Sequence, residues 1–116
     1  MSKFTHSARM EKLATGRQAR AERVARALGF CRGTFREIRP TKQASATVAR
    51  YPNGLEVLIS YQTAVAYRLP DGSFVQTPRN QYSRTTDRSV AEFVRGEAVT
   101  LEPVAFREAL ARHLMR

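Results

Sequence analysis

Residues 47–76 carry the clearest structural signal in the chain and read TVARYPNGLEVLISYQTAVAYRLPDGSFVQ. Two predicted turns divide this stretch, Tyr51–Gly54 and Leu69–Gly72, and each contains Pro, then Asn or Asp, then Gly. Proline presets φ for a turn, and Asn, Asp and Gly tolerate the positions that follow it. The flanking residues are rich in Val, Ile, Tyr and Thr, which favour strands. The stretch therefore predicts an antiparallel meander of three or four strands over residues 46–77.

The segment between the two turns, Leu55–Leu69, allows two interpretations. Its fifteen residues include no Gly, Pro, Asn or Asp. Either it is one long bent strand, or it folds sharply near Tyr61–Thr63. We favour a bent or bulged strand, because a bulge re-aims side chains without requiring turn residues.

The sequence before the meander predicts a helix over residues 7–28. Ser7 can cap its start, and Gly29 can end it in the left-handed conformation. Apolar residues recur on one stripe at helical spacing, beside a face of basic residues. Residues 34–39 are less clear and could form an edge strand.

Two shorter helices are predicted after the meander. Thr85 or Thr86 is expected to cap the first, and Pro103 to occupy the first turn of the second. The hydroxyls and arginines around the two threonines could also bind an anion, although we favour a capping role. The predicted fold is a single α+β domain whose two C-terminal helices cover one sheet face. Its parts are a basic helical arm at 1–42, an antiparallel sheet at 46–77 and C-terminal helices at 85–115.

The charge of the chain is strongly basic and unevenly distributed. Twenty Lys and Arg stand against ten Asp and Glu, a net charge of +10. Residues 1–42 hold eleven of the basic and three of the acidic side chains, whereas residues 43–82 and 83–116 carry a net +1 each. This asymmetry favours a polyanion partner, either DNA or RNA, that the first third of the chain contacts.

Arginine side chains form the predicted nucleic-acid-binding surface, because a guanidinium binds phosphate bidentately and stacks on bases. The alternative is a solvated helix face without a partner. The predicted phosphate-binding residues are Arg9, Lys12, Arg17, Arg20, Arg23, Arg26, Arg32, Arg36 and Arg39.

A second group of predicted ligands lies on or beside the sheet and could contact and stack on bases. Alternatively, aromatic residues of the strands could belong to the core. This group is Tyr61, Arg68, Arg79 and Arg84.

Several classes of protein are disfavoured. Cys31 is the single cysteine, so one chain forms no disulfide and no cysteine-based metal site, as is typical of a reducing compartment. No His-x-x-x-His motif, phosphate loop or nucleophile elbow occurs, so we expect neither an enzyme nor a cofactor or metal. No signal peptide or membrane-spanning run is present. We expect a cytoplasmic monomer or homodimer.

Residues 53–93 contain a series of short motifs. They include Asn53-Gly54, then Ser-Tyr-Gln-Thr-Ala-Val-Ala at 60–66, then Tyr-Ser-Arg-Thr-Thr at 82–86, with Phe93 downstream. This pattern resembles a family of small uncharacterised proteins found mostly in phages and mobile elements. Members of that family often carry His three residues after the paired threonines, where this chain has Ser89.

Two functions follow as expectations. The first is a nucleic-acid-binding accessory protein of phage or mobile-element type, which contacts phosphates through the arginines of the N-terminal helix. The second, which the resemblance implies, is an inhibitor protein that binds and blocks a host defence complex such as a CRISPR effector. Direct nucleic-acid binding should weaken steeply with added salt.

Overall fold

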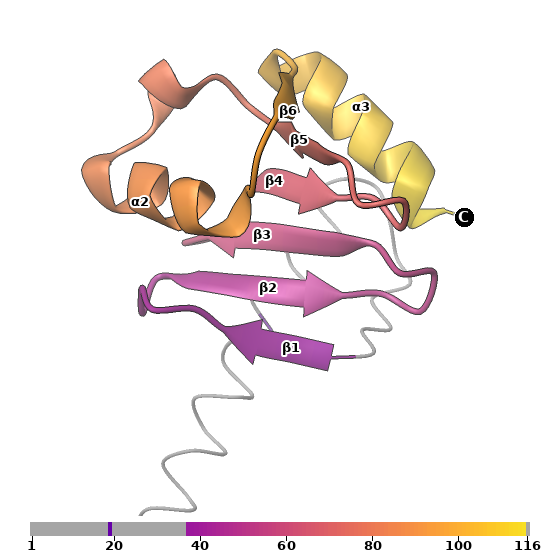
Figure 1. Ribbon diagram of the computed structural model, residues 1–116, viewed down its shortest axis with the longest axis horizontal. Helices are drawn as coiled ribbons and strands as arrows, with labels where there is room; N and C mark the ends of the chain where they lie inside the picture. Colours follow the sequence, from indigo (N-terminus) through magenta and orange to yellow (C-terminus); the bar gives the residue numbers. More distant parts are fainter. Residues whose placement is uncertain (1–18, 20–36, 116) are drawn as a thin grey trace, which may run out of the picture.

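A six-stranded sheet lies at the centre of the computed structural model, which describes Ala19 and residues 37–115 (Figure 1). Neighbouring strands follow chain order across the sheet. The first five pair antiparallel, whereas β6 runs parallel to β5. The strands are β1 (Glu37–Pro40), β2 (Ala46–Arg50), β3 (Glu56–Ser60), β4 (Thr63–Arg68), β5 (Phe74–Gln76) and β6 (Ala98–Thr100).

The parallel pair results from the connection between its two strands. After β5 the chain forms a 3-10 turn, η1 (Arg79–Gln81), and a helix, α2 (Arg84–Phe93), before it returns as β6. Parallel neighbours require such a crossover, whereas antiparallel neighbours need only a tight turn. A second helix, α3 (Pro103–Leu114), follows β6 and begins with Pro at its first turn.

The two predicted turns, Tyr51–Gly54 and Leu69–Gly72, are present as the β2–β3 and β4–β5 connections. Gly54 and Gly72 adopt φ of 91° and 96°, which an L side chain rarely tolerates. The Asn53 side chain also accepts a hydrogen bond from the Leu55 amide at 3.1 Å and donates one to the His113 carbonyl at 2.9 Å. This turn is therefore tied to the C-terminal end of α3.

The favoured interpretation of 55–69 as one bent strand is wrong. Ser60 pairs with Thr63, so Tyr61 and Gln62 alone connect β3 to β4. Tyr61 supplies the reversal with a φ of 56°, a conformation that costs a residue with a side chain about 1–2 kcal/mol. Because this turn contains neither Gly nor Asn, the local sequence does not predict that the chain reverses here.

A bulge is nevertheless present inside this hairpin. Leu58 pairs with Ala66 but Ile59 pairs with Ala64, so Val65 is the additional residue on β4. As a result Val65 and Ala66 both join the same core cluster, on the side of α2. The Val65 carbonyl accepts a hydrogen bond from the Thr77 amide at 3.1 Å, one residue beyond the paired part of β5.

The two helices pack on opposite faces of the sheet. On one face, Phe106, Leu110 and Leu114 of α3 pack at helical spacing against a cluster that includes Val57 and Ile59. On the other face, Val90 of α2 packs with Leu58, Val65 and their neighbours. Val57, Leu58 and Ile59 are consecutive and almost fully buried, which is typical of a strand covered on both faces.

The predicted fold class is therefore wrong. The sheet is a mixed one of six strands rather than a meander of three or four, and the helices do not share a face. Strand β6 was not predicted from the sequence, because it has three residues and two of them are exposed. The edge strand considered at 34–39 is described from Glu37 to Pro40, with Pro on the edge as strand chemistry requires. The helix predicted at 7–28 lies outside the described residues, except for Ala19.

Candidate nucleic-acid interface

Charged side chains line up across the sheet on the face that α2 partly covers. In the strand register Glu56 of β3 lies directly between Arg50 of β2 and Arg68 of β4. Residues paired in this way point to the same face, with Cβ atoms about 5 Å apart. Arg39 of β1, which pairs with Val48, faces the same side. Glu56 thus lies next to arginines of three strands.

Glu56 forms an ion pair within this row. One of its carboxylate oxygens accepts a hydrogen bond from Nη2 of Arg39 at 3.4 Å. The Glu56 side chain is 14% exposed and that of Arg39 is 53% exposed. The carboxylate therefore lies on the floor of the surface, whereas the guanidinium remains accessible to a ligand.

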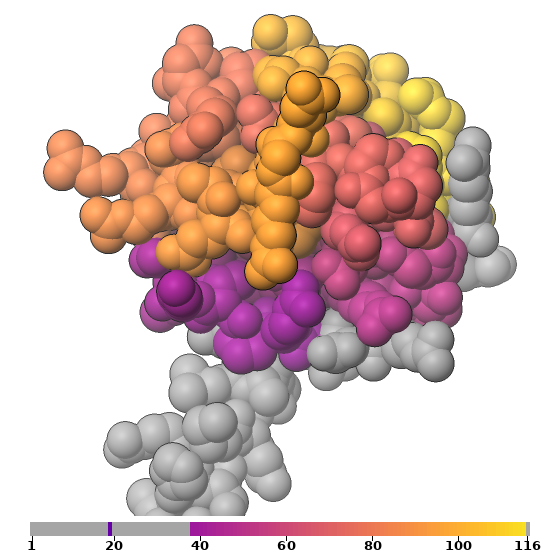
Figure 2. Space-filling view, in the orientation of Figure 1, coloured from indigo at the N-terminus to yellow at the C-terminus, as the bar shows by residue number. Residues whose placement is uncertain are grey.

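A groove of about 840 Å³ opens above this row. Its basic side chains come from four places in the chain: Arg39 in β1, Lys42 in the following loop, Arg68 at the end of β4, and Arg95 after α2. Glu56 and Glu92 are its carboxylates, and Phe74 and Phe93 form an edge-to-face pair with ring centroids 5.6 Å apart. Figure 2 shows the face on which the purple, pink and orange segments that line this groove meet. We name it the basic groove.

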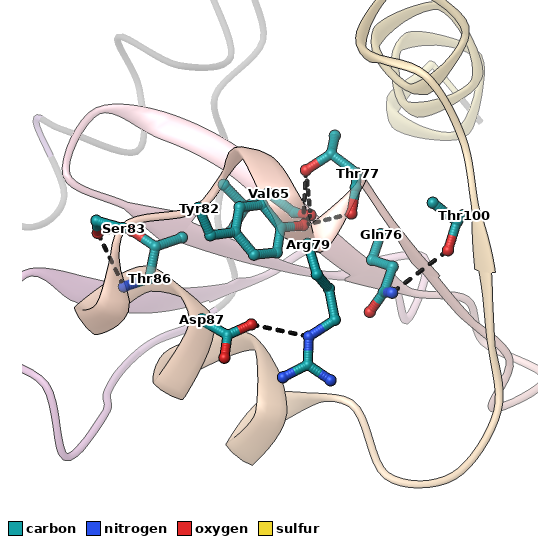
Figure 3. A network of polar contacts seen from close by, with 9 residues as sticks. All are labelled: Val65, Gln76, Thr77, Arg79, Tyr82, Ser83, Thr86, Asp87 and Thr100. Atoms are coloured by element: carbon teal, nitrogen blue, oxygen red, sulfur yellow. Dashed lines mark hydrogen bonds and ion pairs between the residues drawn. The ribbon is translucent and has the colours of Figure 1, made fainter.

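Among the predicted site residues that the structure describes, it brings Arg39 and Arg68 together in the basic groove. Arg79 instead donates a hydrogen bond from Nε to Asp87 at 2.8 Å (Figure 3). This hydrogen bond lowers the pKa of Asp87 and raises that of Arg79. Arg84 is exposed in the first turn of α2 and does not line the basic groove. The remaining predicted basic residues, Arg9, Lys12, Arg17, Arg20, Arg23, Arg26, Arg32 and Arg36, lie outside the described part of the chain.

Tyr61 is the exposed tyrosine of the described chain, at 55%. It lies at the tip of the β3–β4 hairpin, whereas the basic groove is lined by Glu56 at the opposite end of β3. Tyr51 and Tyr67 are core residues, and the Tyr67 ring packs against Phe106 with centroids 5.2 Å apart. Base stacking on the sheet surface is thus not available to the buried rings.

Lys42, Glu56 and Arg95 belong to the basic groove but were not predicted as nucleic-acid ligands. For Glu56 the signal was present in the sequence, since a tight turn after Arg50 places the two residues opposite each other on paired strands. Arg95 carried no such signal, because only the path of α2 across the sheet brings it near β1.

The motif residues of 53–93 have structural roles that sequence analysis did not assign. Ser83 is the N-cap of α2, and its hydroxyl accepts a hydrogen bond from the Thr86 amide at 3.2 Å (Figure 3). The hydroxyls of Thr86 and Ser60 lie 2.8 Å apart in a buried contact. The cap is therefore Ser83 rather than Thr85 or Thr86, and Thr86 joins the start of the helix to the β3–β4 hairpin.

Tyr82 performs a similar function at the bulge. Its hydroxyl lies 2.7 Å from the Thr77 carbonyl and 3.1 Å from the Val65 carbonyl (Figure 3). Burial raises the pKa of Tyr82, so the phenol stays protonated and able to donate. Ser89 is buried and donates a hydrogen bond to the Thr85 carbonyl at 3.2 Å.

The described residues form neither a cluster of metal ligands nor a membrane-spanning helix. Within Ala19 and 37–115, His, Cys, Asp and Glu side chains do not gather in a group of three or more that could hold a metal ion. No helix in that part of the chain combines the length and the apolar character needed to cross a membrane. His113 lies on the α3 face, where its ring is 5.6 Å from that of Tyr67.

Comparison with known proteins identifies one family. Residues 36–106 match a protein family described as a family of unknown function (DUF8033). The match spans β1 to the first turn of α3 and includes the basic groove and the motif residues at 53–93. Neither a curated protein nor a solved structure matches the chain.

Proposed function

We propose that this chain, which belongs to the family of unknown function DUF8033, binds nucleic acid and that the basic groove is one of its phosphate-contacting surfaces. Arg39, Lys42, Arg68 and Arg95 are the proposed ligands. The arginines predicted from Arg9 to Arg36 would extend this contact. The proposed role is binding rather than catalysis.

The observation that carries this proposal is the convergence of four basic side chains from four separate elements on one groove. Residues 37–115 carry only a small excess of positive charge, with ten basic and eight acidic side chains. Their distribution over the surface, rather than their number, is therefore what supports an anionic ligand. Lys42, Arg68 and Arg95 have no carboxylate partner within hydrogen-bonding distance among the described residues, so they remain available to phosphate oxygens.

The carboxylate at the floor of the basic groove also fits this role. Because Glu56 pairs with Arg39, it holds one guanidinium above the sheet in a defined orientation. A positioned Arg loses less side-chain entropy when it binds phosphate than a freely rotating one. Glu56 therefore offsets part of the positive charge of the groove, but it also holds Arg39 in an orientation that suits phosphate binding.

The proposal is tested by fluorescence anisotropy with labelled single- and double-stranded DNA and RNA in a salt series. Each phosphate neutralised adds roughly −0.9 to the slope of log K against log salt on duplex DNA, and roughly −0.7 on single strands. We expect the double variant Arg68→Glu, Arg95→Glu to bind at least about tenfold more weakly at low salt and to show a shallower slope.

Arg112→Glu is the matched control for this experiment. Arg112 is exposed on α3, the helix of the opposite sheet face, so each substitution makes the same change of charge away from the basic groove. If the groove variant and the double control variant Arg88→Glu, Arg112→Glu, whose two arginines are exposed and line neither pocket, weaken binding equally, net charge rather than the groove explains the affinity. If the unmodified chain binds none of the four nucleic acids at low salt, the proposed function is wrong.

A second role is proposed from the resemblance of residues 53–93 to phage and mobile-element proteins. In that setting a small cytoplasmic basic protein could bind and block a host defence complex. A pull-down from nuclease-treated host lysate tests this role, with Arg68→Glu, Arg95→Glu as the comparison bait. Capture of the same protein complex by both baits would separate this role from nucleic-acid binding through the basic groove.

A further inference from the structure

A second groove opens at the other end of the sheet. Within β4, strand β5 pairs with Ala66–Arg68, so the first half of β4, Thr63–Val65, extends beyond β5. The space beside this half is bordered by the end of η1 and by the first turns of α3. It has a volume of about 510 Å³, within the range of about 300–1,000 Å³ typical of small-molecule sites. We name it the edge groove.

The lining of the edge groove differs from that of the basic groove. Its apolar lining residues are Ala64, Val65, Pro103 and Phe106, and no carboxylate lines it. The side chains of Gln62, Gln81 and Arg107 also line it. Within the described chain, these three side chains have no hydrogen-bond or ion-pair partner. By contrast, the hydroxyls of Tyr82 and Thr77 already bond to each other and to the backbone.

The three side chains without a partner in the described chain, Gln62, Gln81 and Arg107, indicate which chemical groups a ligand of the edge groove must carry. Each Gln amide presents a donor and an acceptor side by side, which matches the edge of a nucleobase. Arg107 supplies one positive charge in a groove that no carboxylate lines, which suits a single phosphate. An apolar wall beside two amides can cover the faces of a planar heterocycle but leaves its polar edge bonded.

We propose that the edge groove binds one unpaired nucleobase, with Arg107 at its phosphate. This inference rests on the proposed function, since it adds a base-binding subsite to a phosphate-binding surface. A paired base presents its Watson–Crick edge to its partner, so the subsite selects single strands. Tyr61 precedes Gln62 in the same turn, is 55% exposed and offers a ring on which an adjacent base can stack.

Nuclear magnetic resonance tests the subsite directly, because Gln side-chain amides give separate signals. The full chain, labelled with ¹⁵N, is titrated with nucleoside 5′-monophosphates and, in parallel, with inorganic phosphate. We expect the amide signals of Gln62 and Gln81 to shift saturably with the nucleotides and not with phosphate. The Gln76 amide, which donates to the Thr100 hydroxyl at 3.3 Å outside the groove, should remain unchanged.

Substitutions provide the second measurement. Gln62→Ala together with Gln81→Ala should weaken nucleotide binding by about tenfold, since two hydrogen bonds are lost. The same variant should weaken binding of single-stranded oligonucleotides but leave a duplex of equal length unaffected. Asn80→Ala is the matched control, because Asn80 is an exposed amide in the same 3-10 turn and does not line the edge groove.

The outcomes separate this inference from the proposed function. Equal shifts with phosphate alone, or no shift of Gln62 and Gln81 at millimolar nucleotide, would overturn the base-binding subsite even if oligonucleotides bind the basic groove. A duplex affinity that falls as much as the single-strand affinity would also overturn it. Conversely, nucleotide-dependent shifts without any oligonucleotide binding would support the subsite and refute the proposed function.

Discussion

Replacing Glu56 with Gln should make the protein less stable and yet tighten its binding to nucleic acid. The substitution keeps the size and the hydrogen-bonding oxygen of the side chain but removes its charge. Glu56 is opposite Arg50 and Arg68 in the strand register and accepts a hydrogen bond from Arg39 at 3.4 Å. Without the carboxylate, the three guanidinium groups repel one another and attract a phosphate more strongly.

The two effects can be estimated from the structure. The Arg39 side chain is 53% exposed, so its ion pair contributes about 0.5–1 kcal/mol rather than the larger value of a buried pair. A loss of that size lowers Tm by roughly 2–8 °C in a domain of this length. A phosphate about 8 Å from the carboxylate is repelled by roughly 0.5–2 kcal/mol, depending on the local dielectric. Removing that repulsion tightens binding roughly two- to thirtyfold at low salt.

The assay combines thermal unfolding with anisotropy at about 50 and 200 mM salt, where screening over a Debye length of roughly 7–14 Å reduces the gain. Glu108→Gln is the control, because Glu108 is exposed on α3 and its substitution changes the net charge equally. A folded Glu56→Gln variant that binds no more tightly than Glu108→Gln would refute the reasoning. Such a result would mean that phosphates do not approach the basic groove.

Three further predictions concern stability. Ser60→Ala should lower the free energy of unfolding by about 0.5–1.5 kcal/mol, because it removes the 2.8 Å contact with the buried Thr86 hydroxyl, which keeps its 3.1 Å hydrogen bond from the Ser83 hydroxyl; chemical denaturation measures this, and a loss below about 0.3 kcal/mol would argue against the contact. Thr47→Val should instead raise that free energy by about 1 kcal/mol, since the Thr47 hydroxyl is buried and has no hydrogen-bond partner among the residues that the structure describes; a lower denaturation midpoint for the variant would contradict this. Asp87 has a pKa below its ordinary 3.8, chiefly because an arginine donates a hydrogen bond to it. The ionised Asp87 carboxylate therefore contributes to the free energy of unfolding above about pH 4, and this contribution is lost as the pH falls through the lower pKa of the folded state. Between pH 7 and pH 2.5, the measured Tm should therefore fall less for Asp87→Asn than for the unmodified chain.

Local sequence was a reliable guide wherever one residue type has one conformational role. The turns at Tyr51–Gly54 and Leu69–Gly72 follow from Pro with Asn-Gly and Asp-Gly, and both glycines adopt positive φ. Pro103 likewise stands at the start of α3. In each case the preference belongs to the residue itself and needs no distant partner.

The predictions from sequence failed where tertiary packing outweighs the conformational preference of the residue itself. Tyr61 adopts a φ of 56° that its own side chain disfavours, because Ser60 and Thr63 on either side of the turn are held in the ladder. Ser60 is further held by Thr86 of α2, which lies 26 residues away. A propensity argument cannot anticipate a turn whose strain is offset by contacts of such sequence separation.

The candidate site likewise combines features that the sequence alone predicts with features that only the tertiary structure sets. The sequence alone determined that the chain is basic, that its charge is concentrated before residue 43, and that arginine dominates. Only the tertiary structure decided that Arg39, Arg68 and Arg95 share a groove and that Arg79 is occupied by Asp87. The physical reason is register: side chains alternate between sheet faces, so a two-residue turn and a one-residue bulge determine which charges become neighbours.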